Sequence, residues 1–167
     1  MEIRLLEDPA EKRAVTRLVL EDLPEWFGIP QAREAYIAES AACPFFCAFL
    51  EGGPAGFLYL KETGKDTAEV AAMGVRRAFH RHGIGRALLK RAKAAARAQG
   101  YSFLQVKTVQ MGRYAAYDRT NRFYLAMGFR EFEVFPDLWD QWNPCQVYVM
   151  ALRAPGDGGD GEDVRME

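Results

Sequence analysis

The sequence has few cysteines and no long apolar run, and both absences narrow the class of protein. Its three cysteines, Cys43, Cys47 and Cys145, are too few and odd in number for a disulfide framework. Only two histidines accompany them, without the spacing of a structural zinc site, so we expect buried, reduced thiols and no metal. No run approaches the roughly 18 to 20 apolar residues of a membrane span, and the N-terminus lacks the apolar core of a signal peptide. We therefore expect a cytoplasmic protein that does not use a membrane.

An excess of charge of one sign is also missing. The formal net charge is −1, which argues against a dedicated nucleic-acid binder. The chain has 167 residues, enough for one domain with a proper core. We place this domain at residues 1–153 and expect the acidic, glycine-rich residues 154–167 to be disordered.

Acidic residues are absent from Val70 through Tyr117, whereas arginine and lysine recur throughout that segment. Lys90, Lys93 and Arg97 follow one face at helical spacing, which favours a solvated helix face. Other members of the basic set lie beside glycines and are better candidates for contact with an anion; these are Arg81 and Arg86.

The glycines Gly83 and Gly85 open a predicted helix that runs to about Gln99. A short basic turn joins this helix to a preceding strand, predicted over residues 66–75. At such a helix start the backbone can approach a ligand closely, and several unpaired N–H groups point at it, which suits a phosphate or pyrophosphate. A strand predicted over residues 102–109 completes a strand–helix–strand unit. Its two strands are expected to be parallel, so the basic turn lies at a carboxyl strand end, where open α/β sheets bind ligands.

Apolar alternation, helical spacing and turn residues predict the other elements. We expect helices from Pro9, over residues 31–41 and over residues 117–127. We expect further strands at residues 3–6, 45–50, 55–60, 129–135 and 146–152. The second and third of these form a hairpin, and the last two are antiparallel.

Three segments together resemble the GNAT superfamily of acetyl-CoA-dependent N-acetyltransferases. They are the strand end Met73-Gly74-Val75, the turn His80-x-x-Gly83-x-Gly85, and the later run Phe123-Tyr124-Leu125-Ala126-Met127-Gly128-Phe129. The resemblance covers about residues 3–152. Where the family turn usually begins with Gln or Arg this chain has His80, which can still donate to a phosphate. The resemblance implies a single-domain α/β fold whose central sheet is mixed, mostly antiparallel, and built of six to seven strands. That sheet is splayed at the cofactor cleft and flanked by about four helices.

The resemblance also implies how acetyl-CoA is bound. Its pantetheine arm would enter the splayed sheet and pair with backbone groups of Met73, Gly74 and Val75. Its pyrophosphate would lie on the N–H groups of the basic turn, namely those of Arg81, His82, Gly83, Ile84, Gly85 and Arg86.

Acetyl transfer requires an uncharged amine, so a group must accept its proton. Glu69 stands where histone-acetylating relatives carry a catalytic glutamate, and we expect it to be buried among apolar neighbours. We interpret it as the general base, acting directly or through a water. It can equally be a solvent-facing strand residue or a hydrogen-bond partner for a loop.

Tyr124 matches the tyrosine that protonates the departing thiolate in many relatives, although a core aromatic beside Phe123 is the alternative. Seven residues earlier many relatives carry an asparagine that contacts the cofactor. This chain has Tyr117 there and Asn121 one turn later. Either residue can take over that contact, and Asn121 can equally be an exposed helix residue.

The resemblance implies an acceptor site between two aromatic segments. One is residues 23–29 with Trp26 and Phe27, and the other is residues 135–144 with Trp139. Aromatic walls suit an acceptor with an apolar or cationic part, although core packing explains the tryptophans as well. We expect a primary amine of a small molecule or peptide as acceptor and no nucleic-acid partner.

Two further questions stay open at this point. A module that binds CoA without transfer, serving as a sensor or interaction partner, is the alternative function. The apolar run at residues 147–152 fits a homodimer interface or burial within one subunit.

Overall fold

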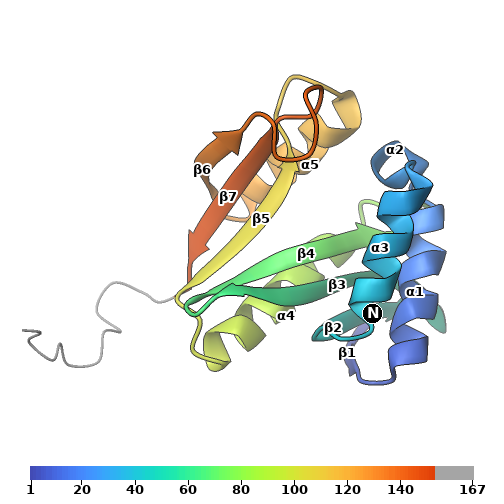
Figure 1. Ribbon diagram of the computed structural model, residues 1–167. Coiled ribbons are helices and arrows are strands. Elements are labelled where there is room, and N and C mark those ends of the chain that lie inside the picture. Colours follow the sequence, from blue (N-terminus) through green and yellow to red (C-terminus); the bar gives the residue numbers. More distant parts are fainter. Residues whose placement is uncertain (153–167) are drawn as a thin grey trace, which may run out of the picture.

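A computed structural model describes residues 1–152, in which seven strands form one mixed sheet (Figure 1). The strands are β1 (Glu2–Leu6), β2 (Phe45–Leu50), β3 (Gly53–Gly64), β4 (Thr67–Val75), β5 (Phe103–Val109), β6 (Arg130–Phe135) and β7 (Cys145–Ala151). They lie in the order β1-β2-β3-β4-β5-β7-β6. Only β4 and β5 are parallel neighbours, as the sequence predicts.

Five α-helices flank the sheet in residues 1–152, where the sequence predicts about four. They are α1 (Pro9–Glu21), α2 (Pro24–Phe27), α3 (Pro30–Ser40), α4 (Ile84–Ala98) and α5 (Ala115–Ala126), and a 3₁₀ turn η1 (Arg77–Phe79) follows β4. The additional helix is α2, a single turn within residues 23–29, for which the sequence predicts no helix. The first three helices each begin with proline, which has no N–H to leave unpaired there.

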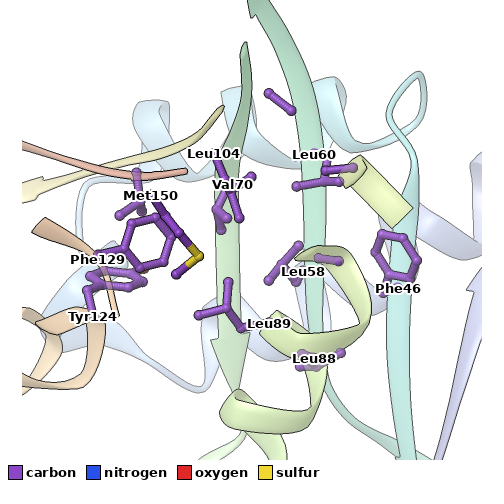
Figure 2. Close-up of a cluster of buried hydrophobic side chains, with 14 of the residues drawn as sticks. Phe46, Leu58, Leu60, Val70, Leu88, Leu89, Leu104, Tyr124, Phe129 and Met150 are labelled. Atoms are coloured by element: carbon purple, nitrogen blue, oxygen red, sulfur yellow. The ribbon is translucent and has the colours of Figure 1, made fainter. Parts of the chain in front are cut away.

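The helices cover both faces of the sheet, so the central strands are buried on both sides. Strand β2 is accordingly a continuous apolar run, Phe-Phe-Cys-Ala-Phe-Leu, instead of an alternating one. On one face α4 and α5 pack against the sheet (Figure 2), where Leu58 and Val70 lie near Leu89 of α4. Tyr124 of α5 and Met150 of β7 extend the same cluster.

On the opposite face α1 packs against a stack of three aromatic rings. Phe57 lies with its ring centroid 5.3 Å from that of Phe45 and 6.0 Å from that of Tyr59. Gly74 of β4 lies directly under this helix. A Cβ at Gly74 would stand 2.9 Å from Cγ1 of Val19 and 3.0 Å from Cδ1 of Leu23, both tighter than ordinary van der Waals contacts. The close packing of α1 therefore favours glycine at this position.

Strands β4 and β5 pair along only part of their length. Thr67–Val70 align with Phe103–Val106, and beyond them the strands diverge (Figure 1). A register shift against β3 leaves Ala71 out of the pairing where the divergence begins. Residues 71–75 of β4 and 107–109 of β5 do not pair with each other, and we call these two segments the β4/β5 split. The predicted splaying of the sheet is thereby confirmed.

Other expectations have simple outcomes. The three cysteines are buried and carry no disulfide, as predicted. Residues 147–152 lie mostly in β7, between β5 and β6, so burial within one subunit explains their apolar character. These residues therefore do not support a homodimer, which stays a prediction. The acidic segment 154–167 and the boundary at residue 153 lie outside the described residues. No helix within residues 1–152 is long and apolar enough to cross a membrane.

Candidate functional site

The backbone of β4 presents alternate residues to the β4/β5 split. The N–H of Arg76 donates to the carbonyl of Ala55 in β3 at 2.8 Å. Every second residue before Arg76 therefore also directs its N–H and carbonyl towards β3, and the residues between direct theirs the other way. By this alternation Gly74 bonds to β3, whereas Met73 and Val75 direct their N–H groups towards the split. Of the three residues expected to pair with a pantetheine arm, only these two have backbone groups facing the right side.

The turn after β4 is held by its own histidines. Nε2 of His80 lies 2.7 Å from the carbonyl oxygen of Val75, and Nδ1 of His82 lies 2.9 Å from the carbonyl oxygen of His80. Because a carbonyl can only accept, both ring nitrogens are donors in these contacts. In this conformation Nε2 of His80 binds the end of β4 and is not available to a phosphate.

The N-terminus of α4 has no capping side chain, because its N-cap residue is Gly83, held at φ 73°. The first hydrogen bond of this helix runs from the N–H of Ala87 to the carbonyl of Gly83 at 3.1 Å. The N–H groups of the preceding residues, Ile84, Gly85 and Arg86, thus have no partner within the helix. Together with the helix dipole they form a site suited to an anion.

The arginines around this turn differ in whether an acidic side chain already binds them. Arg77 is bound to Glu25 of α2 with Nη2 to Oε distances of 2.7 and 2.6 Å, and its N–H donates to Asp22. Arg81 and Arg86 are exposed and form no ion pair with any residue of the described part. These two arginines are therefore available to an anionic ligand.

Glu69 is buried, with 9% of its surface exposed, so the solvent-facing alternative is wrong. It lies opposite Lys61 of β3 and Gln105 of β5. Its Oε1 is 3.1 Å from Nζ of Lys107, which projects from the part of β5 that no longer pairs with β4. The expectation of purely apolar neighbours is therefore wrong, since an ion pair spans the point where the strands separate.

Sequence patterns do not single out Lys107. A signal exists in the alternation of Gln105 and Lys107 on a mostly apolar strand, which places both side chains on one face. Recognising Glu69 as its partner requires the register between β4 and β5, which the sequence does not state.

Tyr124 lies on the other side of the sheet. It packs in one cluster with Val70, whose side chain points to the face opposite that of Glu69. Its ring centroid is 5.6 Å from that of Phe129 and 6.3 Å from that of Tyr148. Its hydroxyl makes no hydrogen bond to any described residue, and burial raises the pKa of Tyr124, so the phenol stays protonated at neutral pH.

Tyr117 and Asn121 are both engaged within the protein. The Tyr117 hydroxyl donates to the carbonyl of Trp26 at 2.9 Å, and burial raises the pKa of Tyr117 to about 12. Asn121 is fully buried, so its exposed alternative is wrong. Its amide nitrogen donates to the carbonyls of Val109 and Tyr117 at 2.8 Å, and its oxygen accepts from Tyr148 at 2.6 Å. These bonds leave Asn121 with a structural role in this conformation.

The aromatic residues expected at the acceptor site differ in exposure. Trp26 is partly buried and donates from Nε1 to Oγ1 of Thr120 at 3.0 Å, and Phe27 lies edge-on to Tyr36. Trp139 is 45% exposed and therefore not part of the core. The loop that carries it is shaped by Asp140, whose carboxylate accepts N–H bonds from the two residues that follow Gln141.

Comparison with known proteins agrees with this arrangement. Residues 12–129 match the model of the acetyltransferase (GNAT) family. A GNAT-family protein from Desulfovibrio desulfuricans superposes with a TM-score of 0.78 at 20% identity, covering 91% of this chain and 99% of that one. No curated protein matches the sequence significantly.

Two other solved structures are similar. An aminoglycoside 6'-N-acetyltransferase complexed with coenzyme A has a TM-score of 0.76 at 15% identity, with coverage of 94% and 100%. The ribosomal-protein-S18-alanine N-acetyltransferase from Escherichia coli has a TM-score of 0.74 at 16% identity, with coverage of 95% and 98%. At these identities the likeness shows the fold.

Proposed function

Because the chain belongs to the GNAT acetyltransferase family, we propose that it transfers an acetyl group from acetyl-CoA directly to a primary amine of a small molecule or peptide. One observation carries this proposal: the uncapped N-terminus of α4 lies beside the end of β4, where that strand has parted from β5. A diphosphate and a linear arm with amide groups need these two features side by side. Two solved structures with the same fold are N-acetyltransferases, which supports an amine as acceptor.

The residues of the chain suit acetyl-CoA as co-substrate. The N–H groups of residues 81–86 and the side chains of Arg81 and Arg86 would bind the diphosphate. The backbone of Met73 would pair with the amides of the arm, whereas the carbonyl of Val75 already accepts from His80. Gly74 is explained by the packing of α1, and His82 supports the turn through His80.

The chemistry follows from the sides on which the candidate groups lie. Glu69 would accept the proton of the attacking amine on one face of the sheet. The N–H of Val75 would bind the carbonyl oxygen as charge develops there. Tyr124, kept protonated by burial, would donate its proton to the sulfur as the C–S bond breaks.

The acceptor is proposed to bind on the face of Glu69, between α2 and the loop after β6. Trp139, which is 45% exposed, would contact an apolar or cationic group of the acceptor. Trp26 and Phe27 would form the opposite wall, although both rings already have partners. A cytoplasmic location accords with this activity and stays part of the proposal.

The test is calorimetric titration with acetyl-CoA, followed by release of free thiol with a panel of primary amines. We expect saturable binding that weakens in Arg81→Gln and Arg86→Gln, because each removes a charge beside the anion site. Lys93→Gln, on the exposed face of the same helix, serves as the matched control. Absence of saturable binding to folded protein contradicts the proposal. Binding without thiol release for any amine supports the alternative, a non-catalytic CoA-binding module.

A further inference from the structure

Trp26 lies between the ends of the two strands that part. On the β4 side, the carbonyl of Val75 accepts from His80, and the His80 ring lies edge-on to the Trp26 ring with centroids 6.4 Å apart. These contacts tie α2 to the turn that follows β4.

Hydrogen bonds continue from Trp26 to the end of β5. Its indole N–H donates to Thr120 at 3.0 Å, and its carbonyl accepts from Tyr117 at 2.9 Å, both residues of α5. Asn121, on the same helix, donates to the carbonyls of Tyr117 and Val109, the last residue of β5. We call this set of residues the Trp26 bridge: Val75, His80, Trp26, Tyr117, Thr120, Asn121 and Val109.

The helix that carries Trp26 is held by the bridge and by the packing of its two aromatic rings. Helix α2 is a single turn without a buried residue or a side-chain cap. Apart from the bridge, Phe27 lies edge-on to Tyr36, Glu25 forms an exposed ion pair with Arg77, and Arg119 lies 5.9 Å from the centroid of the indole ring. Exposed ion pairs contribute little, so the placement of α2 depends on the bridge and on the packing of Trp26 and Phe27 against the buried cluster under α1. Segments with so few buried contacts open more readily than the core.

We propose that Trp26 is a specificity-determining residue, which closes the carboxyl end of the β4/β5 split and thereby limits the size of the acceptor and the access of water. This inference rests on the proposed function, because the group protected is the thioester. With the bridge formed, α2 and α5 are joined across the split. With it broken, larger amines enter, and water can add to the thioester carbonyl. The C–S bond then breaks, giving acetate, a proton and the free thiol of CoA.

The first experiment measures thiol release from acetyl-CoA without any amine. Tyr117→Phe and Thr120→Val each remove one hydrogen bond of the bridge, and Tyr101→Phe removes a remote hydroxyl bond, to Glu62, as the matched control. We expect the two bridge variants to hydrolyse acetyl-CoA about 2- to 10-fold faster than wild type, the range that one hydrogen bond gives. The preference for the smallest over the largest accepted amine should fall by a similar factor.

A second experiment follows the bridge without any ligand. Trp26, Trp139 and Trp142 are the three tryptophans of the chain, and the last two are exposed. In a Trp139→Phe/Trp142→Phe background, Trp26 is thus the only indole. We expect acrylamide to quench its fluorescence more strongly when Thr120→Val is added. Adding Tyr101→Phe should leave the quenching unchanged. Circular dichroism confirms that each variant is folded.

The outcomes separate this inference from the proposed function. Equal quenching with and without Thr120→Val overturns the bridge, whatever the protein binds. If acetyl-CoA binds and the bridge variants hydrolyse it no faster than Tyr101→Phe, the role in access is overturned. If acetyl-CoA does not bind at all, the proposed function fails, and the assigned role of Trp26 fails with it, even where the quenching result supports the contact.

Discussion

Among single residues, Glu69 is the one whose replacement separates chemistry from structure most directly. Glu69→Gln keeps the shape of the side chain and removes both its basicity and its charge opposite Lys107. A general base contributes about 10² to 10⁴ in rate, so we expect kcat to fall by that factor at all pH values. Steady-state kinetics from pH 6 to 10 measure it.

Glu62→Gln is the control for that experiment, because it neutralises an exposed carboxylate on β3 whose partner is Tyr101. If Glu69→Gln reaches near-normal turnover at its own optimum pH, Glu69 is not the base. The ion pair with Lys107 would then be its whole role.

Tyr124 offers a different separation, because its hydroxyl has no hydrogen-bond partner among the described residues. Tyr124→Phe should therefore change the free energy of unfolding by less than about 0.5 kcal/mol. If the hydroxyl protonates the sulfur, kcat should nevertheless fall while affinity for acetyl-CoA is unchanged. Urea unfolding, steady-state kinetics and calorimetry together measure this.

Tyr148→Phe should show the opposite pattern. It removes the 2.6 Å bond to Asn121 and leaves a buried amide oxygen unpaired, which costs about 1 to 3 kcal/mol of stability.

A Tyr124→Phe enzyme with full kcat would contradict the catalytic role of Tyr124 and leave it as a core aromatic.

The candidate site was predictable where it depends on backbone and on residue type, and less so where it depends on side-chain partners. The glycine turn and the buried Glu69 lie where the sequence places them. The partners of His80 and Asn121 are carbonyls at the ends of β4 and β5, and any residue type has a carbonyl. Composition and spacing contain no trace of such bonds, so these side chains were candidates for a ligand until the fold assigned them.

At the scale of elements, long periodic segments were predictable and short or polar ones were not. Strand β2 occupies the predicted residues 45–50, and α4 lies within one residue of its prediction. Helix α2 was missed because four residues cannot display a helical period. Strand β3 runs to Gly64. Its predicted end at residue 60 was too early, because the last residues of the strand are exposed and lack apolar alternation. The insertion of β7 between β5 and β6 depends on long-range pairing.

The contact between α1 and β4 gives a prediction at this scale. Gly74→Ala places a methyl group against Val19 and Leu23, and overpacking of this kind costs about 1 to 3 kcal/mol. Urea unfolding should show this loss. Gly53→Ala, where a Cβ has nothing within 4 Å, is the control. Normal stability with loss of acetyl-CoA binding would mean that Gly74 serves the ligand and not the helix.

For the whole molecule, folding also buries the cysteine thiols. Cys47 lies in the cluster under α1, and Cys145 lies at the start of β7. Burial raises the pKa of Cys47 from 9.0 to about 12 and that of Cys145 to about 11. In the unfolded chain both thiols ionise near their ordinary pKa, whereas in the folded protein they stay protonated well above it.

The free energy of unfolding should therefore depend on pH in alkaline solution. Above pH 9 the unfolded chain binds fewer protons than the folded one, so stability falls as pH rises and continues to fall towards the folded pKa values of about 11 to 12. Below pH 9 both states are protonated, and these thiols contribute no pH dependence. Each thiol adds a slope of up to about 1.4 kcal/mol per pH unit within its window.

Urea unfolding at pH 8, 9, 10 and 10.5, under reducing conditions, measures that slope, and Cys47→Val identifies one source of it. Valine fills a similar buried volume without a titratable group, so its effect on stability at pH 8 should be small. The slope between pH 9 and 10.5 should fall by the share of one thiol. If Cys47→Val and wild type lose stability in parallel, burial of Cys47 does not couple folding to pH. The alkaline loss would then come from other groups such as Tyr117, whose pKa burial also raises to about 12.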